Sequence, residues 1–312
     1  MEIEIKQELA LTEAQGALLD MHSFLNILNV WVGELQVIQL TTDDPHAMAG
    51  SLRTARQVQS LLESKEGHHQ LGAALADGAI SFQAELSAFL EQNPRWRDDA
   101  EVKESVANIN SVLKVMSRRV AEYLERLVDP AAWHPVPVAQ LVDNFRTFFA
   151  AVEKNSKGRY RIIFNIAGQE VSDYVVNLRV ESVDGPMITM PLVLQDVFRD
   201  LIANARKYTP VGGVINAGLL DDGQALRLVV EDTGRGIPAE ELPRVVEYGY
   251  RASNAADVRG MGGGFGLTKA YAVTRQHGGR MWIRSVVGVG TRVTIHLPRP
   301  HAVLKKPEQA IA

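Results

Sequence analysis

Residues 259–269 read Arg259-Gly260-Met261-Gly262-Gly263-Gly264-Phe265-Gly266-Leu267-Thr268-Lys269, with five glycines in seven positions and an amphipathic helix directly behind them. Glycine allows positive φ and lets the backbone come close to a ligand. The free N–H groups and positive dipole end of a helix N-terminus suit phosphate. A glycine-rich turn before a helix is also an ordinary flexible connector, so this stretch has to be weighed with others.

The composition is that of a globular protein with room for about two domains. The chain has 312 residues, 46% of them hydrophobic, and a formal net charge of −4 at pH 7. This charge gives no reason to expect binding to nucleic acid or to a membrane surface. The absence of cysteine excludes disulfides, thiolate metal sites and a cysteine nucleophile.

The start of the chain, residues 1–6, is charged and has no apolar core, so we expect no signal peptide. The most apolar stretch, residues 21–40, is interrupted by polar residues such as Asn26 and Glu34 and cannot form a membrane span. We therefore expect a soluble, cytoplasmic protein.

Residues 1–128 are rich in Ala, Leu, Glu and Gln, and their apolar residues recur at spacings of three and four, which predicts an antiparallel helical bundle. Residues 129–137 are the expected linker, because Pro135 and Pro137 stop a helix and fix an extended path. The predicted helices span about residues 5–40, 46–65, 70–92 and 99–128.

Residues 138–300 alternate strands with helices, which predicts an α+β sandwich with helices on one face of a sheet. A tail, residues 301–312, follows and is expected to be disordered from Lys305. The predicted strands are Tyr160–Ile166, Tyr174–Val180, Val214–Leu220, Leu226–Val230, Arg280–Ser285 and Arg292–Leu297. The predicted helices are 138–153, 190–207, 239–246 and 265–277.

The predicted helix 190–207 carries a polar ridge. Asp200, Asn204 and Lys207 are spaced i, i+4 and i+7, so they share one face. A carboxylate, an amide and a cation on one ridge can hold a hydrated Mg²⁺ ion and its phosphates. A solvated polar face is the alternative explanation.

Two further glycine turns follow apolar strands. The first is Glu231-Asp232-Thr233-Gly234-Arg235-Gly236, where a carboxylate at a strand end can accept a hydrogen bond from an exocyclic amine. Its glycines would let a flat ring approach the backbone. The second is Val287-Gly288-Val289-Gly290-Thr291. A strand-to-helix turn and a hairpin are the ordinary alternatives.

Taken together, these stretches resemble the ATP-binding motifs of the histidine kinase family, part of the wider superfamily of gyrase, Hsp90 and MutL. The resemblance covers about residues 138–298. It rests on Asn204-Ala-Arg-Lys207-Tyr208, Asp232-Thr-Gly234-Arg-Gly236, Gly262-Gly-Gly264-Phe-Gly266-Leu267 and Gly290-Thr291. Glu247-Tyr-Gly-Tyr250-Arg251 is similar to the family's lid motif without its usual first phenylalanine.

The resemblance implies a role for each matched residue. Asn204 would bind Mg²⁺, and Lys207 and Tyr208 would contact phosphate or ribose. Asp232 would bind the adenine amine. The remaining residues that the resemblance implies at the nucleotide are Gly234 and Gly236 in the adenine pocket, Arg251, Gly262, Gly264, Gly266 and Leu267 in the lid, and Thr291 near adenine.

One matched position departs from the family. Asp200 lies where histidine kinases usually carry asparagine. ATP-hydrolysing relatives and mitochondrial-type protein kinases carry a glutamate there that acts as a base, and aspartate is shorter by a methylene. Hydrolysis of ATP and an altered metal site therefore both stay open.

The phosphoryl acceptor that the resemblance implies is a histidine on the first helix of a dimerisation hairpin. Asp20-Met21-His22-Ser23-Phe24-Leu25-Asn26 resembles the family's acceptor motif. His22 and Asn26 share a helix face. Neutral imidazole is a competent nucleophile near pH 7, and the amide could orient a water that dephosphorylates a partner regulator. An inert surface histidine is the alternative.

The residue after His22 also departs from the family, which usually has a Glu or Asp there as a base. Ser23 cannot carry a negative charge at neutral pH, so autokinase activity is expected to be slow or to use another base. The pair 68–69 follows a glycine near a helix break and lacks apolar neighbours, which disfavours it as an acceptor. The rival acceptors are His46, His68, His69 and His134.

The bundle offers four helical segments, whereas a family hairpin has two per chain and dimerises into four. Either residues 42–95 are an insertion in a homodimer formed through the His22 helix and the helix at 99–128, or one chain forms its own bundle. Only 21 residues precede His22, so we expect input through the bundle or from a separate sensory partner.

The expected function is that of a histidine kinase. It would bind ATP and Mg²⁺, phosphorylate itself on His22 and pass the phosphoryl group to a response regulator receiver domain, with Asn26, Lys207 and Asp200 as further catalytic residues. Two alternatives stay open. One is a nucleotide-binding scaffold or phosphotransfer module, favoured by Ser23. The other is a protein serine kinase or ATPase of the same superfamily, favoured by Asp200.

Overall fold

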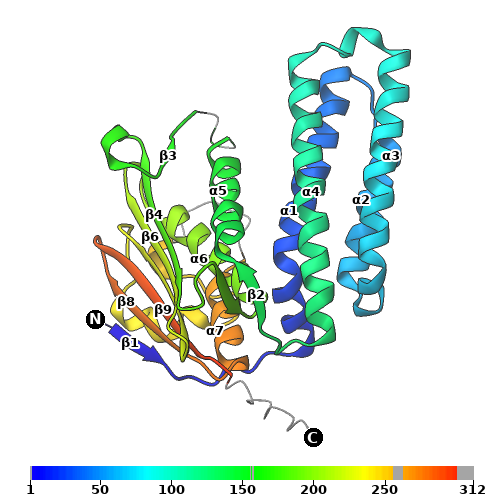
Figure 1. Ribbon diagram of the computed structural model, residues 1–312. Coiled ribbons are helices and arrows are strands. Elements are labelled where there is room, and N and C mark those ends of the chain that lie inside the picture. Colours follow the sequence, from blue (N-terminus) through cyan, green and yellow to red (C-terminus); the bar gives the residue numbers. More distant parts are fainter. Residues whose placement is uncertain (1, 155, 157, 256–262, 301–312) are drawn as a thin grey trace, which may run out of the picture. The chain divides into compact units, whose positions relative to one another are not determined.

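The chain divides into two compact units in the computed structural model (Figure 1). The helical unit spans Ala10–Pro130, and the C-terminal unit combines the residues up to Leu9 with those from Ala131 onward. The chain therefore passes between the units twice, which differs from the predicted division at residues 129–137. The structure describes residues 2–154, 156, 158–255 and 263–300; Gly262 and the tail from residue 301, both named in the sequence predictions, lie outside these ranges.

The helical unit is a four-helix bundle made by one chain. The helices follow one another in space as they do in sequence, and α1 also packs against α4, which closes the bundle. Its core contains the fully buried side chains of Phe24, Trp31 and Phe82. Of the two predicted arrangements, the structure therefore has the one in which a single chain forms its own bundle. The helices are α1 (Glu13–Thr42), α2 (Ala49–Glu63), α3 (Leu71–Gln92) and α4 (Ala100–Val128), with short 3₁₀ turns at Lys65–Gln70 and Pro94–Trp96.

Side chains at the helix starts explain where these helices begin. The Thr12 hydroxyl accepts the Gln15 N–H and the Gln15 side chain accepts the Thr12 N–H, a capping box that starts α1. Asp99 caps α4 in a similar way. No side chain of its own segment caps α2. Instead the Glu85 carboxylate of α3 accepts its first N–H groups, so α2 depends on α3 for its start.

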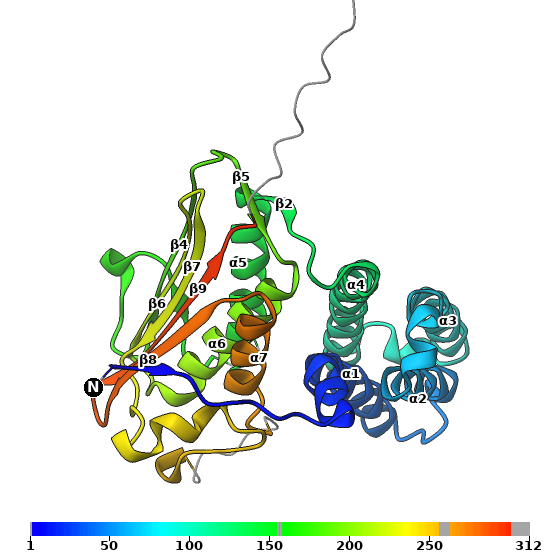
Figure 2. The same ribbon diagram turned by 90° about the horizontal axis from the view of Figure 1, so that it is seen from below.

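The C-terminal unit is a seven-stranded mixed sheet with helices on one face (Figure 2). This confirms the predicted α+β sandwich. The strands in spatial order are β1 (Glu2–Ile5), β8 (Arg280–Val286), β9 (Gly290–Pro298), β7 (Ala225–Asp232), β6 (Val214–Asp221), β4 (Tyr174–Ser182) and β3 (Ile162–Ile163). The helices are α5 (Val138–Lys154), α6 (Val193–Tyr208) and α7 (Gly266–Gln276).

Alternation along the strands creates the core of this unit. Leu228 and Val230 of β7 are buried under the helices, as are Ile283 of β8 and Ile295 of β9. Residues between them face the other side of the sheet and are partly or fully exposed. Such period-two burial is expected for a sheet covered on one face.

Three local predictions differ from the structure. Residues 160–166 were predicted as one strand, but only Ile162–Ile163 forms a paired strand, followed by a 3₁₀ turn at Ile166–Gly168. The predicted helix 239–246 is a 3₁₀ helix, because Pro243 within it has no N–H to donate. The expected linker contributes strand β2 (His134–Pro137), which pairs with β5 (Met187–Met190) as a separate two-stranded sheet.

The fourth difference is at the start of the chain. The sequence predicted helix from about residue 5, but residues 2–5 form strand β1, antiparallel to β8. Ile5 is 4% exposed and belongs to the core of the C-terminal unit. Residues 2–5 alternate acidic and apolar side chains, a strand pattern that four residues are too few to distinguish from helix.

Candidate functional site

Helix α6 presents the predicted polar ridge because its opposite side is buried. Val197, Leu201 and Ala205 lie in the core. Asp200, Asn204 and Lys207 are only partly buried. The helix therefore holds a carboxylate, an amide and an ammonium group along one face, as the spacing predicted.

Asp232 ends strand β7 and is the centre of the second motif. Its Oδ1 accepts hydrogen bonds from the N–H of Gly234 at 2.8 Å and from the N–H of Thr291 at 3.3 Å. Burial raises the pKa of the Asp232 carboxyl to about 6, and these two N–H donors oppose part of that rise. A half-buried carboxylate of this kind gains from a further donor such as an exocyclic amine.

Thr291 is brought to Asp232 by sheet register. The two residues face each other across β7 and β9. The Thr291 hydroxyl lies 2.9 Å from the hydroxyl of Ser285, which itself accepts the Ile237 N–H at 2.8 Å. Ser285 thus ties the β8–β9 hairpin to the turn after Asp232, a role that its place in an apolar strand did not reveal.

The glycine turn after Asp232 packs against the end of α6. The Arg235 N–H donates to the Tyr208 carbonyl at 3.1 Å. A Cβ on Gly234 would lie 2.5 Å from the same carbonyl oxygen. Backbone packing thus explains why glycine occupies this position, a reason other than the close approach of a ring that the sequence suggested.

The start of α7 meets the polar ridge of α6. A Cβ added to Gly266 would lie 2.6 Å from Asn204 Nδ2, so only glycine leaves the Asn204 amide in place. Gly264 has φ +79°, in the region that favours glycine. Leu267 packs partly buried against the core. The end of the glycine-rich stretch and the Asn204 motif therefore meet directly.

The segment 247–255, which contains the weaker lid motif, is tied to the Asp232 turn. The Asn254 amide donates to the Gly236 carbonyl at 3.0 Å. Glu241 accepts hydrogen bonds from the Tyr250 hydroxyl and the Ser253 N–H, both at 2.8 Å. Arg251 donates to the Ala255 carbonyl at 3.3 Å. In this structure Arg251 therefore contacts its own loop.

Lys269 is a further polar residue of this site that was not predicted from the sequence. Its side chain is 5% exposed, and its Nζ lies 3.5 Å from Asp200 Oδ2 on the neighbouring helix. The feature that could have revealed this residue is the place of the lysine between Thr268 and Ala270, which are both fully buried in α7. A lysine at such a position needs an acid beside it.

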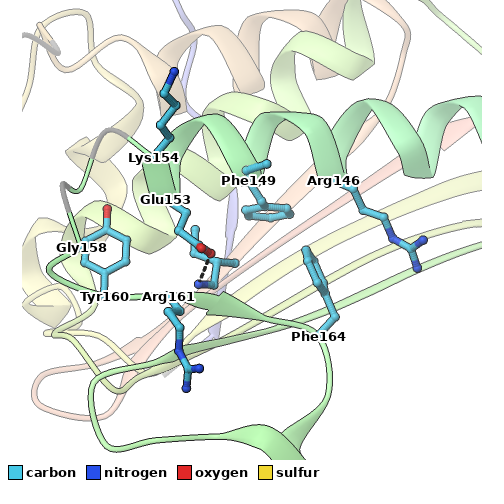
Figure 3. Close-up of a pocket in the computed structure, with 10 residues that line it drawn as sticks. Arg146, Phe149, Glu153, Lys154, Gly158, Tyr160, Arg161 and Phe164 are labelled. Atoms are coloured by element: carbon cyan, nitrogen blue, oxygen red, sulfur yellow. Dashed lines mark hydrogen bonds between the residues drawn. The ribbon is translucent and has the colours of Figure 1, made fainter. Parts of the chain in front are cut away.

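A separate cavity of about 360 Å³ lies between α5 and the segment around β3 (Figure 3). Glu153 accepts the Ile162 N–H at 2.6 Å on one wall, and the rings of Phe149 and Phe164 meet edge to face on another. None of the residues predicted at the nucleotide lines this cavity. It is therefore distinct from the candidate site.

His22 and Asn26 meet on α1. Asn26 Nδ2 lies 3.2 Å from His22 Nε2, and the imidazole is partly buried. If the amide donates, Nε2 is the acceptor and the ring proton sits on Nδ1. The pair therefore favours the tautomer whose Nε2 lone pair can act as a nucleophile.

His68 has a structural role. It is 5% exposed, its Nδ1 lies 2.8 Å from the Tyr123 hydroxyl, and its Nε2 lies 3.3 Å from the Leu62 carbonyl oxygen. Burial raises the pKa of Tyr123 to about 12, so the phenol keeps its proton and can donate. The prediction that residues 68–69 lack apolar neighbours is therefore wrong for His68. Because its imidazole is buried, His68 is also a poor rival for the acceptor role.

A family model described as "Histidine kinase-, DNA gyrase B-, and HSP90-like ATPase" matches residues 189–301, the segment that holds Asn204, Asp232, Gly266 and Thr291. Residues 189–301 therefore form an ATPase domain of the kind that this model describes. The predicted ATP-binding motifs all lie within this ATPase domain.

Curated relatives agree with this assignment. Sensor histidine kinase Hik2 of Thermosynechococcus vestitus is 43% identical over 108 residues, 34% of this chain and 28% of the relative. Histidine protein kinase DivJ of Caulobacter vibrioides is 38% identical over 105 residues, 34% of this chain and 17% of the relative. Phosphate regulon sensor protein PhoR of Pseudomonas aeruginosa is 29% identical over 234 residues, 73% of this chain and 47% of the relative. The chain thus spans less than half the length of each.

The similar solved structures include a sensor histidine kinase. "Mycobacterial sensor histidine kinase MprB" covers 54% of this chain and 97% of its own at 21% identity, with a TM-score of 0.38. That score is too low to bear on the fold. In the part of the chain that the structure describes, no helix is both long and apolar enough to cross a membrane.

The donor set fits Mg²⁺ brought in with a nucleotide. Among the described residues, no cluster of three or more His, Asp or Glu side chains could hold a metal ion alone. Mg²⁺ usually keeps several waters and binds through one or two protein oxygens and the substrate phosphates. The Asn204 amide on α6 can supply such an oxygen.

Proposed function

We propose that this chain is a histidine kinase that binds ATP with Mg²⁺ in its ATPase domain and autophosphorylates on His22. The observation that carries most weight is the environment of the Asp232 carboxylate. A half-buried carboxylate there is held by the N–H groups of Gly234 and Thr291, and its pKa is raised to about 6 by burial. The adenine amine supplies the donor that such a carboxylate accepts.

Residues of this chain then position the rest of the nucleotide. Asn204 binds the metal, which neutralises phosphate charge when present. Lys207 and Tyr208, at the end of the same helix, contact the phosphates or the ribose. The lid residues Arg251, Gly264, Gly266 and Leu267 contact the phosphates. Most of the catalysis is positioning and charge stabilisation, as expected for phosphoryl transfer.

The transfer step is a substitution at phosphorus. The Nε2 lone pair of His22 attacks the γ-phosphorus, and the bond from that phosphorus to the β,γ-bridging oxygen breaks. ADP leaves with the electron pair, and the Nδ1 proton remains on the ring. Asn26 holds the reactive tautomer and must turn aside as Nε2 attacks.

The phosphoryl group then passes to an aspartate of a response regulator receiver domain. Support comes from the names of the relatives, which include sensor histidine kinases. A separate sensory partner is part of the same proposal. Asn26 is the residue placed to orient a water when the partner is dephosphorylated.

The homodimer stays a prediction. The inner faces of α1 and α4 already pack with α2 and α3 in the core of one chain. A homodimer of this protein would therefore use outer faces of the bundle. Light scattering on the purified chain distinguishes a 34.3 kDa monomer from a dimer of twice that mass.

Incubation with γ-labelled ATP tests the kinase. We expect label that is lost in acid and absent from His22→Ala. The matched control is His69→Ala, an exposed histidine of the same unit. Label that remains in His22→Ala contradicts the assignment of the acceptor.

Two other outcomes support the alternatives. ATP binding without any label supports the scaffold or phosphotransfer module that Ser23 favours. Acid-stable label on another protein, or phosphate release that needs Asp200, supports the protein serine kinase or ATPase. Absence of ATP binding contradicts all three.

A further inference from the structure

A buried lysine joins the two helices of the candidate site. Lys269 lies in the first turns of α7, its side chain is 5% exposed, and its Nζ is 3.5 Å from Asp200 Oδ2 and 4.0 Å from Asp196 Oδ2. Among the described residues its Nζ has no hydrogen-bond partner. Ion pairing with the two carboxylates is therefore what stabilises this buried charge.

Lys269 forms its ion pair mainly with Asp200. Asp196 is 6% exposed and is already paired with Arg199 one turn further along α6. Asp200 is 28% exposed and is the nearer carboxylate. Lys269 thus neutralises the carboxylate of the polar ridge, that of Asp200.

The same two helices meet a second time. Gly266 and Lys269 are three residues apart on α7, and Asn204 and Asp200 are four residues apart on α6, so each pair shares a helix face. Gly266 packs on the Asn204 amide, while Lys269 reaches Asp200. Helix α7, which follows the glycine-rich stretch, therefore contacts two of the three polar groups of the ridge, those of Asn204 and Asp200.

We propose that Lys269 is a positioning residue that holds the Asp200 carboxylate away from bound ATP and so suppresses hydrolysis. The inference rests on the nucleotide site proposed above. A carboxylate engaged by a buried ammonium group is a weak and misdirected base. Bound ATP is then preserved for transfer to histidine.

The suppressed reaction is the hydrolysis of ATP by water. A water oxygen attacks the γ-phosphorus, the bond to the β,γ-bridging oxygen breaks, and ADP leaves with the electron pair. The water proton passes to a carboxylate oxygen of Asp200, and phosphate is released. A positioned base contributes ~10²–10⁴-fold to such a step. Removal of the Lys269 charge should free the Asp200 carboxylate and restore part of this rate enhancement.

The experiment measures phosphate release and ATP binding on the full chain. Lys269→Met keeps the length of the side chain and removes its charge. We expect kcat for phosphate release to rise about tenfold or more, with KM changed less than about threefold. Lys269→Arg, which can keep the ion pair, should stay near the wild-type rate. In Lys269→Met with Asp200→Asn, the increase should disappear.

Other results overturn the inference. These are an unchanged kcat in Lys269→Met that still binds ATP, or an increase that survives Asp200→Asn. If Lys269→Met fails to fold, Lys269→Gln, which also removes the charge, takes its place and should show the same rise in kcat for phosphate release. A Lys269→Gln variant that binds ATP and keeps the wild-type rate overturns the inference. If the wild-type chain does not bind ATP, the proposed function is overturned as well.

Discussion

Glu4 on β1 accepts two hydrogen bonds from the Arg280 guanidinium on β8, at 2.6 and 2.7 Å, although 276 residues separate them along the chain. The guanidinium lowers the pKa of the Glu4 carboxyl to about 2. The pair fixes the register in which β1 extends the sheet. The ATPase domain is therefore completed by residues that precede the helical unit in sequence.

The first prediction concerns this strand. Ile5→Ala removes a side chain that is 4% exposed in the core and should destabilise the C-terminal unit by about 2–5 kcal/mol. Amide hydrogen exchange in residues 280–286 should become faster, because β8 loses a stable neighbour. Ile80→Ala, at a residue 70% exposed in the helical unit, is the control.

Glu4 should matter in a defined pH range. Its pKa is lowered on folding, so its stabilising contribution is present above about pH 4.5 and is lost as pH falls toward about 2. Glu4→Gln should therefore lower the melting temperature slightly at pH 7 and have no effect near pH 2. An equal effect at both pH values would contradict the ion pair as the cause.

The third prediction is a pH dependence of adenine binding. In the proposed site Asp232 accepts the adenine amine most strongly when its carboxyl is ionised, and burial raises the pKa of that carboxyl to about 6. Affinity for adenosine should be constant above about pH 7 and fall about tenfold per pH unit below pH 5. Adenosine has no phosphate that titrates in this range, and calorimetry measures its affinity directly.

Asp232→Asn is the matching variant. It should lose most of the nucleotide affinity, because an amide presents fewer acceptor sites to the amine. It should also melt at a higher temperature at pH 7, since a raised pKa means that ionisation of Asp232 destabilises the folded state. Unchanged affinity from pH 5 to pH 7 in the wild type would refute the role of Asp232.

The fourth prediction concerns the contact between α6 and α7. Gly266→Ala places a Cβ 2.6 Å from Asn204 Nδ2, which must then move. Affinity for ATP with Mg²⁺ should fall tenfold or more, equal to about 1.4 kcal/mol, while affinity for adenosine changes little. Gly168→Ala is the control, because its Cβ meets nothing within 4 Å. Unchanged ATP affinity in Gly266→Ala would remove Asn204 from the site.

The fifth prediction concerns the helical unit. The Glu85 carboxylate accepts the N–H groups of Gly50 and Ser51 and the Ser51 hydroxyl, at 2.6 to 2.8 Å. Glu85→Ala leaves these donors unpaired and should cost about 1.5–3 kcal/mol. Urea unfolding followed by circular dichroism measures it. Glu91→Ala, an exposed acid on α3, should have little effect.

Much of the ATPase domain was predictable from local patterns. Asp200, Asn204 and Lys207 share a face because the helical period requires it. Alternating apolar residues predicted the positions of β6, β7, β8 and β9. Asp232 and Thr291 were recognised from their motifs, but their hydrogen bond follows from the β7–β9 register, which sequence spacing does not define.

In the helical bundle, too, local sequence patterns predicted the elements but not the contacts between them. The helices were predicted from their apolar spacing, yet the choice between one chain and two depends on which apolar stripes meet. Burial of Trp31 and Phe82 in a single core decides it. The dependence of α2 on Glu85 is also a contact between helices, 34 and 35 residues apart, and no local pattern predicts it.

The sequence by itself determined the motifs of the ATPase domain, the helical segment with His22 and Asn26, and the α+β class, because these follow from residue type and short periodicity. Only the tertiary structure decided that residues 2–5 complete the sheet, that one chain closes its own bundle, and that Lys269 faces Asp200. Each depends on which surfaces meet across long stretches of chain. Burial of apolar area and pairing of buried charges select those contacts, and neither is a local property.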